Sequence, residues 1–291
     1  MKHALVFGGS GQIGRPLLSL LLRDGWRVTA LSRQPQHERP GLTWLHGDFS
    51  TLPAVPAQVD AILSCGPLDA FAQWYARAPV ECERVIAFGS TSVEVKRGSA
   101  DPRERDVAQR LRAGEEGVLA TALRRSAQAT LLRPTLVYGA GRDATLTRIA
   151  RLAQRWGRFP LPRNALGRRQ PVHVGDLAAA AFAALGSPAS HGQVYALPGG
   201  ETLAYRDMVH RVLAVLQPPA TLIELPSPVF NLALAAAKFA GGTGLGEAAV
   251  QRMRSDLVFD DAPARRDLGY APRAFQPTAR MFEVREDEDE A

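Results

Sequence analysis

The feature that most constrains the fold is the run HALVFGGSGQIG at residues 3–14. A short apolar segment predicts a β-strand over His3–Phe7, and the apolar spacing over Gln12–Arg23 predicts an α-helix that ends at Asp24-Gly25. The glycines between them permit a sharp turn, because the main chain there can approach neighbouring groups without a Cβ in the way. A strand that passes through glycines into a helix is typical of the first unit of a parallel α/β sheet.

Alternating apolar runs and helical patterns continue through the first half of the chain. Further strands are predicted at Trp26–Leu31, Thr43–His46, Ala61–Ser64, Val85–Phe88 and Thr130–Arg133. A helix over about 103–124 joins the last two. Strands that are apolar on both faces imply a parallel sheet covered on both sides. The predicted fold class is therefore α/β, a doubly wound parallel sheet of the Rossmann type with a smaller, mostly helical C-terminal substrate-binding region.

The pattern loosens after Pro134. Residues 1–138 are predicted to form the sheet domain, to which the chain returns at about 170–198. Residues 139–283 are predicted to form the smaller, interleaved region, and the acidic end at 284–291 is predicted to be a disordered tail. Within the smaller region, a helix predicted over 229–240 is apolar nearly all round, which favours a buried helix over a surface for a partner.

Composition excludes several classes of protein. Hydrophobic residues make up 46% of the 291 residues, but no apolar run reaches the ~18 residues of a membrane-spanning helix, and glycines follow the first strand too early for a signal peptide. The basic residues behind the net charge of +6 are scattered without interleaved aromatics, which argues against a nucleic-acid partner. Cys65 and Cys82 are too few for a disulfide framework or a zinc site, so no metal is expected. We expect a reduced, cytoplasmic protein.

A phosphate-binding loop is predicted at Gly8, Gly9, Ser10, Gly11, Gln12, Ile13 and Gly14. The glycines satisfy both a three-residue spacing and the pattern G-x-G-x-x-G, between a predicted strand and a predicted helix. Main-chain N–H groups at such a turn stabilise a pyrophosphate, and glycine lets the backbone approach it. The loop therefore predicts dinucleotide binding, and the alternative is a turn that needs glycine for packing alone.

The end of the second strand distinguishes the two nicotinamide dinucleotides. A carboxylate at this place would bind the ribose 2′-hydroxyl of NAD, but the chain reads LSRQ at 31–34. Ser32 and Arg33 suit a 2′-phosphate, because a guanidinium forms paired charge-assisted hydrogen bonds with phosphate oxygens. The sequence favours NADP as the cofactor, with NAD as the alternative.

Motifs along nearly the whole chain resemble the extended and atypical short-chain dehydrogenase/reductases, the nucleotide-sugar epimerase/dehydratase superfamily. Beyond the glycine loop, the matching segments are GDF at 47–49, SCGP at 64–67, LRPTLVYGAGRD at 132–143, GRRQPVHVGDLA at 167–178 and RRDLGYAPR at 265–273. The resemblance implies that Asp48 and Phe49 lie at the adenine. It also implies that Cys65, Gly66 and Pro67 border the cofactor.

The residues after the fifth strand match the family only in part. Ser90 matches the family's hydroxyl residue, three positions before Val93, so the resemblance implies that it lies beside the cofactor and binds a substrate oxygen. Family enzymes then use a Tyr as acid or base, with a Lys four residues later that lowers the tyrosine pKa. This chain has neither residue on the predicted helix over 103–124.

The glutamates of that helix define two possible alignments with the family. Many members carry a Glu four residues after the Lys. With Glu115 in that place, Val107 and Leu111 occupy the Tyr and Lys positions. With Glu116 there, the two positions fall on Ala108 and Arg112 instead.

Lys96 and Tyr138 are the candidate replacements for proton transfer. Lys96 follows the hydroxyl residues at the sheet edge where ligands bind, and the alternative is a surface lysine. Tyr138 lies in RPTLVYG, where the family has a structural or cofactor-side aromatic residue. Its alternative role is packing.

Arg169 and His173 are the candidate substrate-binding residues. The resemblance implies that Arg169, four positions before His173, grips the pyrophosphate of a nucleotide sugar. The alternative is an arginine in a basic loop. His173 titrates in the neutral range when unperturbed, and its alternative role is packing.

Two main functions remain open from the sequence, and a third is an assembly factor that uses the predicted helix over 229–240 as its contact surface. The first is an NADP(H)-binding epimerase/dehydratase-like or reductase-like enzyme with an altered acid/base site, acting on a nucleotide sugar or another small polar molecule. The second is a catalytically depleted NADP(H)-binding protein with a structural, regulatory or redox-sensing role. By analogy with the family, the protein is also a candidate homodimer.

Overall fold

A computed structural model describes residues 1–51, 54–239 and 247–283. The chain divides into two compact units, of which the first comprises Met1–Thr135, Val174–Leu197 and Phe259–Pro272. The second comprises Leu136–His173, Pro198–Val258 and the chain from Arg273 onward. The segment Phe259–Pro272 thus lies in the first unit, whereas the sequence assigned it to the smaller region. The predicted tail at 284–291 and residue 240 of the predicted helix lie outside the described residues.

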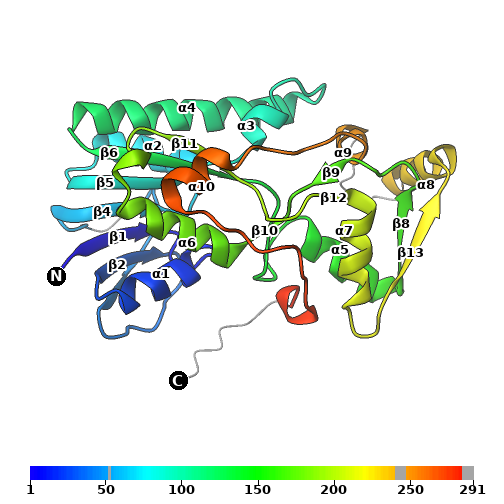
Figure 1. The fold of residues 1–291 in the computed structure, drawn as a ribbon, viewed down its shortest axis with the longest axis horizontal. Coiled ribbons are helices and arrows are strands. Elements are labelled where there is room, and N and C mark those ends of the chain that lie inside the picture. Colours follow the sequence, from blue (N-terminus) through cyan, green and yellow to red (C-terminus); the bar gives the residue numbers. More distant parts are fainter. Residues whose placement is uncertain (52–53, 240–246, 284–291) are drawn as a thin grey trace. The chain divides into compact units, whose positions relative to one another are not determined.

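The first unit is built on a seven-stranded parallel sheet (Figure 1). Its strands are β1 (His3–Phe7), β2 (Arg27–Ser32), β3 (Leu42–His46), β4 (Gln58–Ser64), β5 (Glu81–Phe88), β6 (Gln128–Pro134) and β11 (Val194–Leu197). They lie in the order β11-β6-β5-β4-β1-β2-β3. The order reverses between β1 and β4, so the carboxyl ends of these two strands form the switch point where this class of sheet binds ligands. The predicted fold class is confirmed.

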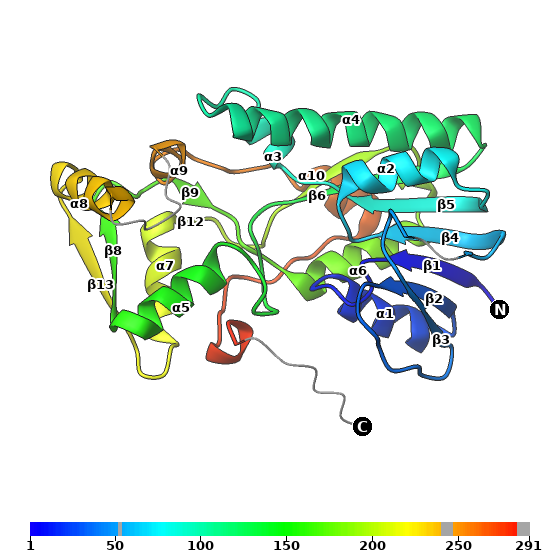
Figure 2. The same cartoon turned by 180° about the vertical axis from the view of Figure 1, so that it is seen from behind.

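Helices cover both faces of this sheet (Figures 1 and 2). On one face α1 (Gly14–Arg23) packs against α6 (Val174–Leu185), and on the other α2 (Leu68–Arg77) packs against α4 (Pro102–Arg124). The short helix α3 (Ser92–Val95) contacts α4. The remaining elements of this unit, α10 (Ala262–Leu268) and the 3-10 helix Pro188–Ser190, contact each other.

The core of the first unit explains why its strands are apolar on both faces. All five residues of β1 are buried, because helices pack on both sides of it. On the side of α2, the ring of Phe71 stacks on that of Tyr75 with centroids 5.8 Å apart and contacts Phe7 at 5.6 Å. This packing fixes the carboxyl ends of β1 and β4, where the glycine loop begins.

The second unit has its own core and three two-stranded ladders. The ladders pair β7 (Val137–Tyr138) with β10 (Val172–His173), β8 (Arg158–Pro162) with β13 (Thr221–Leu225), and β9 (Arg168–Arg169) with β12 (Leu203–Ala204). Its helices are α5 (Leu146–Trp156), α7 (Tyr205–Ala214), α8 (Ser227–Phe239), α9 (Glu247–Arg252) and the 3-10 helix Ala279–Met281. Side chains of α5 and α7 form much of the core, including Leu146, Ala150, Met208 and Val212.

The described part of α8 is not a buried helix. Val229 is 49% exposed and Leu232 is 73% exposed, whereas Phe230 between them is buried. The expectation of a buried helix over 229–240 is therefore wrong for these side chains. Among the described residues, no helix combines the length and the hydropathy that a membrane span needs.

Candidate functional site

The glycine loop is folded so tightly that side chains are excluded from it. The Gly11 N–H donates to Gly8 O at 2.9 Å, and Gly8 has a φ of +72°, a conformation that favours glycine. A Cβ on Gly14 would lie 2.1 Å from Gly8 O and 2.6 Å from Gly9 O. A Cβ on Gly9 would lie 3.0 Å from the Cβ of Ala30. Each glycine thus allows a close approach that another residue would block.

The start of α1 leaves polar groups for a ligand. The residue at the helix N-cap, Ile13, makes no side-chain hydrogen bond to the first turn, and that turn contains no acidic residue. The Gln12 side-chain oxygen in the loop and the Ser64 hydroxyl at the end of β4 are buried, and within the described residues neither has a hydrogen-bond partner. Buried polar atoms normally have a partner, so these two favour a bound group. The cradle therefore fits the pyrophosphate of a dinucleotide.

The end of β2 lies against the glycine loop. The Ser32 hydroxyl donates to the hydroxyl of Ser10 at 3.2 Å and accepts the N–H of Gln34 at 3.2 Å. Ser32 is buried, and Arg33 after it is exposed. The structure therefore brings Ser32, one of the two predicted 2′-phosphate residues, into contact with the predicted pyrophosphate loop.

The two segments predicted to border the cofactor after strands three and four, 47–49 and 64–67, also meet at the end of β1. The Phe49 ring stacks on that of Phe7 at the end of β1, with centroids 5.1 Å apart. The Cys65 N–H donates to Phe7 O at 2.9 Å, and a Cβ on Gly66 would lie 3.5 Å from the Phe49 ring. Burial raises the pKa of the Cys65 thiol to about 12, so this thiol stays protonated at neutral pH. Pro67 follows as the N-cap residue of α2.

Asp48 is ionised and held in a local turn. One of its carboxylate oxygens accepts hydrogen bonds from the hydroxyl and N–H of Ser50 and from the N–H and hydroxyl of Thr51. These bonds, led by the Ser50 hydroxyl, lower the pKa of Asp48 to about 2. All four donors contact Oδ1, which leaves Oδ2 oriented as an acceptor for another group.

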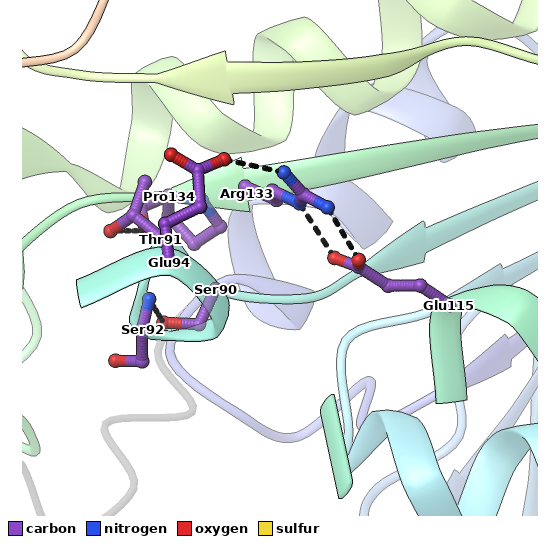
Figure 3. A network of polar contacts seen from close by, with 7 residues as sticks. All are labelled: Ser90, Thr91, Ser92, Glu94, Glu115, Arg133 and Pro134. Atoms are coloured by element: carbon purple, nitrogen blue, oxygen red, sulfur yellow. Dashed lines mark hydrogen bonds and ion pairs between the residues drawn. The ribbon is translucent and has the colours of Figure 1, made fainter. Parts of the chain in front are cut away.

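Ser90 occupies the carboxyl end of β5. Its hydroxyl oxygen accepts the N–H of Ser92 at 3.1 Å, so the hydroxyl proton is directed elsewhere (Figure 3). Thr91 fixes this turn, because its N–H and its hydroxyl both donate to Pro134 O, at 3.2 and 3.1 Å. Lys96 is half-buried at the C-cap of α3, and its N–H donates to Ser92 O.

An arginine with two carboxylates lies beside this turn (Figure 3). Arg133 on β6 donates through Nε and Nη2 to the two oxygens of Glu115, at 2.7 and 2.6 Å. Its Nη1 donates to Glu94 on α3 at 2.7 Å. The Glu115 side chain is 6% exposed and that of Glu94 56%. Sequence reasoning assigned no role to Arg133 or to this network, although a helix glutamate and a strand arginine at the same sheet edge are a recognisable pair.

The network favours one of the two alignments of α4 with the family. Glu115 is buried and paired, whereas Glu116 is exposed. The buried glutamate places Val107 and Leu111 at the positions of the family's Tyr and Lys, and both are half-buried apolar residues. Neither Val107 nor Leu111 has a group that exchanges a proton with a substrate oxygen.

Tyr138 and His173 lie in the second unit and contact each other. Tyr138 is 1% exposed, and its ring meets those of His173 and Phe275 edge-on, with centroids 5.3 and 4.9 Å apart. β7 and β10 pair at this point, with Tyr138 opposite His173. These contacts favour the packing role for both residues over proton transfer or substrate binding.

The role predicted for Arg169 is revised by its contacts. Arg169 is 5% exposed, and its guanidinium donates to the main-chain oxygens of Arg168, Ser255 and Arg252. It also lies over the Tyr205 ring, 5.3 Å from the centroid. Arg169 therefore anchors the segment at 252–255 to β9, which accounts for its burial without a pyrophosphate.

Comparison with known proteins decides the family. The model of the NAD dependent epimerase/dehydratase family matches residues 4–94 and 108–197, which are more than half of the chain. The chain belongs to this family. The match includes the glycine loop, Ser90 and Arg133, and the helix that lacks the Tyr and Lys begins in the gap between its two parts.

Relatives of this family member differ in what they act on. It is 25% identical over 319 residues to the 2-alkyl-3-oxoalkanoate reductase of Stenotrophomonas maltophilia, covering 92% of this chain and 94% of the relative. It is 26% identical over 175 residues to the UDP-glucose 4-epimerase of Vibrio cholerae, covering 58% and 51% of the two chains. The structure of UDP-glucuronic acid 4-epimerase from Bacillus cereus in complex with NAD has the same fold, with a TM-score of 0.69 at 13% identity and coverage of 97% and 98%.

Proposed function

We propose that this family member binds NADP(H) and acts as an epimerase/dehydratase-like or reductase-like enzyme with an altered acid/base site. The observation that carries the proposal is the cradle, in which a Cβ on Gly14 would lie 2.1 Å from Gly8 O. A turn of this tightness directs main-chain N–H groups at an anion. When bound, the dinucleotide supplies a hydride donor or acceptor at its nicotinamide.

The choice of NADP over NAD rests on the end of β2. Ser10 and Ser32 present two hydroxyls in contact, and the exposed Arg33 follows them. No carboxylate occurs between Asp24 and Glu38 to bind a 2′-hydroxyl. The hydroxyls and the guanidinium supply donors of the kind that a 2′-phosphate requires.

Ser90 is the residue proposed to bind the reacting oxygen of the substrate. Because its Oγ already accepts the Ser92 N–H, its O–H is the group that donates to a substrate hydroxyl or carbonyl. The substrate proposed is a nucleotide sugar or another small polar molecule with such a group. Two relatives support this range, one named as a UDP-glucose 4-epimerase and the other as a 2-alkyl-3-oxoalkanoate reductase.

The altered acid/base site follows from α4. Val107 and Leu111 carry no proton that a substrate oxygen can exchange, so the proposed chemistry depends on Ser90, Lys96 and solvent water. Loss of a positioned acid typically slows such reactions by about 10²–10⁴. We therefore expect slow turnover.

A panel of UDP-sugars and 3-oxo compounds tests this function. Consumption of NADPH, or interconversion of the sugars, is measured for the native chain and for Ser90→Ala. Turnover that falls at least about tenfold in Ser90→Ala supports the proposal. Turnover that is unchanged in this variant contradicts the role of Ser90.

The second function is a catalytically depleted NADP(H)-binding protein. The observation that favours it is the burial of Glu115, because this burial supports the alignment in which apolar residues stand at the Tyr and Lys positions. Saturable NADPH binding with no turnover of any compound in the panel is its expected result.

A further inference from the structure

Arg15 lies beside the same serine pair as Arg33. It is the second residue of α1, and its side chain turns back along the glycine loop, where Nε donates to Ser10 O at 3.2 Å. The Ser10 hydroxyl in turn contacts the Ser32 hydroxyl at 3.2 Å. Arg15 therefore contacts the serine pair from the loop side through Ser10, and Arg33 directly follows Ser32 at the end of β2.

The position of Arg15 is electrostatically unfavourable in the protein alone. The N-terminus of a helix carries partial positive charge, so a cation there is destabilising and acidic residues are preferred. α1 has no acidic residue in its first turn, and the chain has none before Asp24. An anion bound next to Arg15 would offset this repulsion, which would explain why the chain has an arginine at this end of α1.

The charge of a 2′-phosphate exceeds what the single guanidinium of Arg33 balances. A phosphate monoester carries about −1.5 to −2 at neutral pH, and it accepts hydrogen bonds on three oxygens. The hydroxyls of Ser10 and Ser32 and the guanidinium of Arg33 can donate to only some of the acceptor sites on these three oxygens. A second guanidinium from the loop side supplies a further pair of donors.

We propose that Arg15 is a second 2′-phosphate ligand and thereby sets the preference for NADP(H) over NAD(H). This inference rests on the proposed function, because it needs a dinucleotide in the glycine loop. A contact of Arg15 with the pyrophosphate would affect both coenzymes equally. A contact with the 2′-phosphate affects NADPH alone.

The test compares Kd values of NADPH and NADH for the native chain and Arg15→Gln, measured by coenzyme fluorescence. We expect NADPH binding to weaken by about tenfold or more, and NADH binding to change less than about twofold. Arg23→Gln is the matched control, because Arg23 lies on the same helix and its Nε also donates to the main-chain oxygen of an earlier serine, Ser19, at 3.2 Å. It should leave both Kd values unchanged.

A fragment separates the phosphate from the rest of the coenzyme. Adenosine 2′,5′-bisphosphate should bind the native chain more tightly than AMP, and Arg15→Gln should remove most of this difference. The thermal midpoint of Arg15→Gln without ligand should equal or exceed that of the native chain, since a cation leaves the positive end of α1.

Three results overturn the inference. Equal weakening of NADPH and NADH in Arg15→Gln would assign the residue to the pyrophosphate or to the loop structure. Unchanged NADPH binding would remove it from the site. If the native chain binds neither coenzyme, the proposed function itself fails. If the native chain binds both coenzymes and Arg15→Gln changes neither Kd, only the inference about Arg15 fails.

Discussion

The carboxylate of Glu115 receives two parallel hydrogen bonds from Arg133, with distances of 2.7 Å to Nε and 2.6 Å to Nη2. This pair joins α4 to the carboxyl end of β6. A Cβ on Gly89, at the end of β5, would lie 3.0 Å from a Glu115 oxygen. The pair therefore fills the space beside the turn that carries Ser90.

Glu115→Gln should destabilise the protein by about 3 kcal/mol, because it leaves a largely buried guanidinium with only Glu94 as a charged partner. Urea unfolding followed by circular dichroism measures the change. Glu116→Gln is the matched control, since this neighbour is exposed and should shift stability by less than about 0.5 kcal/mol. Equal effects of the two substitutions would contradict the structural role of the pair.

The double variant Val107→Tyr, Leu111→Lys should raise turnover by about 10²-fold or more, because it restores a positioned proton donor. Steady-state rates on the substrate panel measure this gain. The matched control, Val107→Phe with Leu111→Lys, has the ring without the hydroxyl and should show no gain. Equal rates for the two double variants would contradict the alignment in which Val107 and Leu111 occupy the family's Tyr and Lys positions.

Gly14→Ala should weaken coenzyme binding by at least about tenfold, since its Cβ would lie 2.1 Å from Gly8 O and force the loop open. Isothermal titration with NADPH measures the loss. Gly186→Ala is the control, because a Cβ at that position would meet no atom within 4 Å. Native-like affinity in Gly14→Ala would refute the cradle as the binding element.

His3 should make stability fall as the pH drops below 6.5. Burial, with the neighbouring Arg27 guanidinium, lowers the pKa of His3 from 6.5, while Asp60 opposes the shift. The unfolded chain therefore binds more protons here, so the stabilisation is fully present above pH 6.5 and is lost as pH falls through the folded pKa. Urea midpoints across this range should fall more steeply for the native chain than for His3→Gln. Parallel curves would rule out His3 as the source.

The sheet and its cofactor edge were predictable because their signals are local. The apolar run of β1 ends where the sequence placed it, and the strands β4 and β5 only begin earlier, at polar residues Gln58 and Glu81. Gln58 and Glu81 pair with each other at the amino ends of β4 and β5, and both side chains are exposed. Because these residues are polar, the apolar pattern did not include them in the predicted strands. The helix α2 was not predicted, although its buried residues Leu68, Phe71, Ala72 and Tyr75 follow a helical spacing.

The roles of single arginines were not predictable in the same way. Arg133 and Arg169 both stand in motif-like segments, yet one pairs with Glu115 and the other binds main-chain oxygens of residues far along the chain. Such partners are set by tertiary contacts. The exposure of Leu232 on an apolar helix likewise depends on which face of the helix packs against the rest of the protein.

A titration of the purified protein with NADPH and NADH measures most directly whether the glycine loop binds a dinucleotide and whether Arg33 recognises its 2′-phosphate. We predict saturable binding of both coenzymes with a lower Kd for NADPH, and a loss of that preference in Arg33→Gln. The absence of a saturable signal with either coenzyme would contradict dinucleotide binding by this loop.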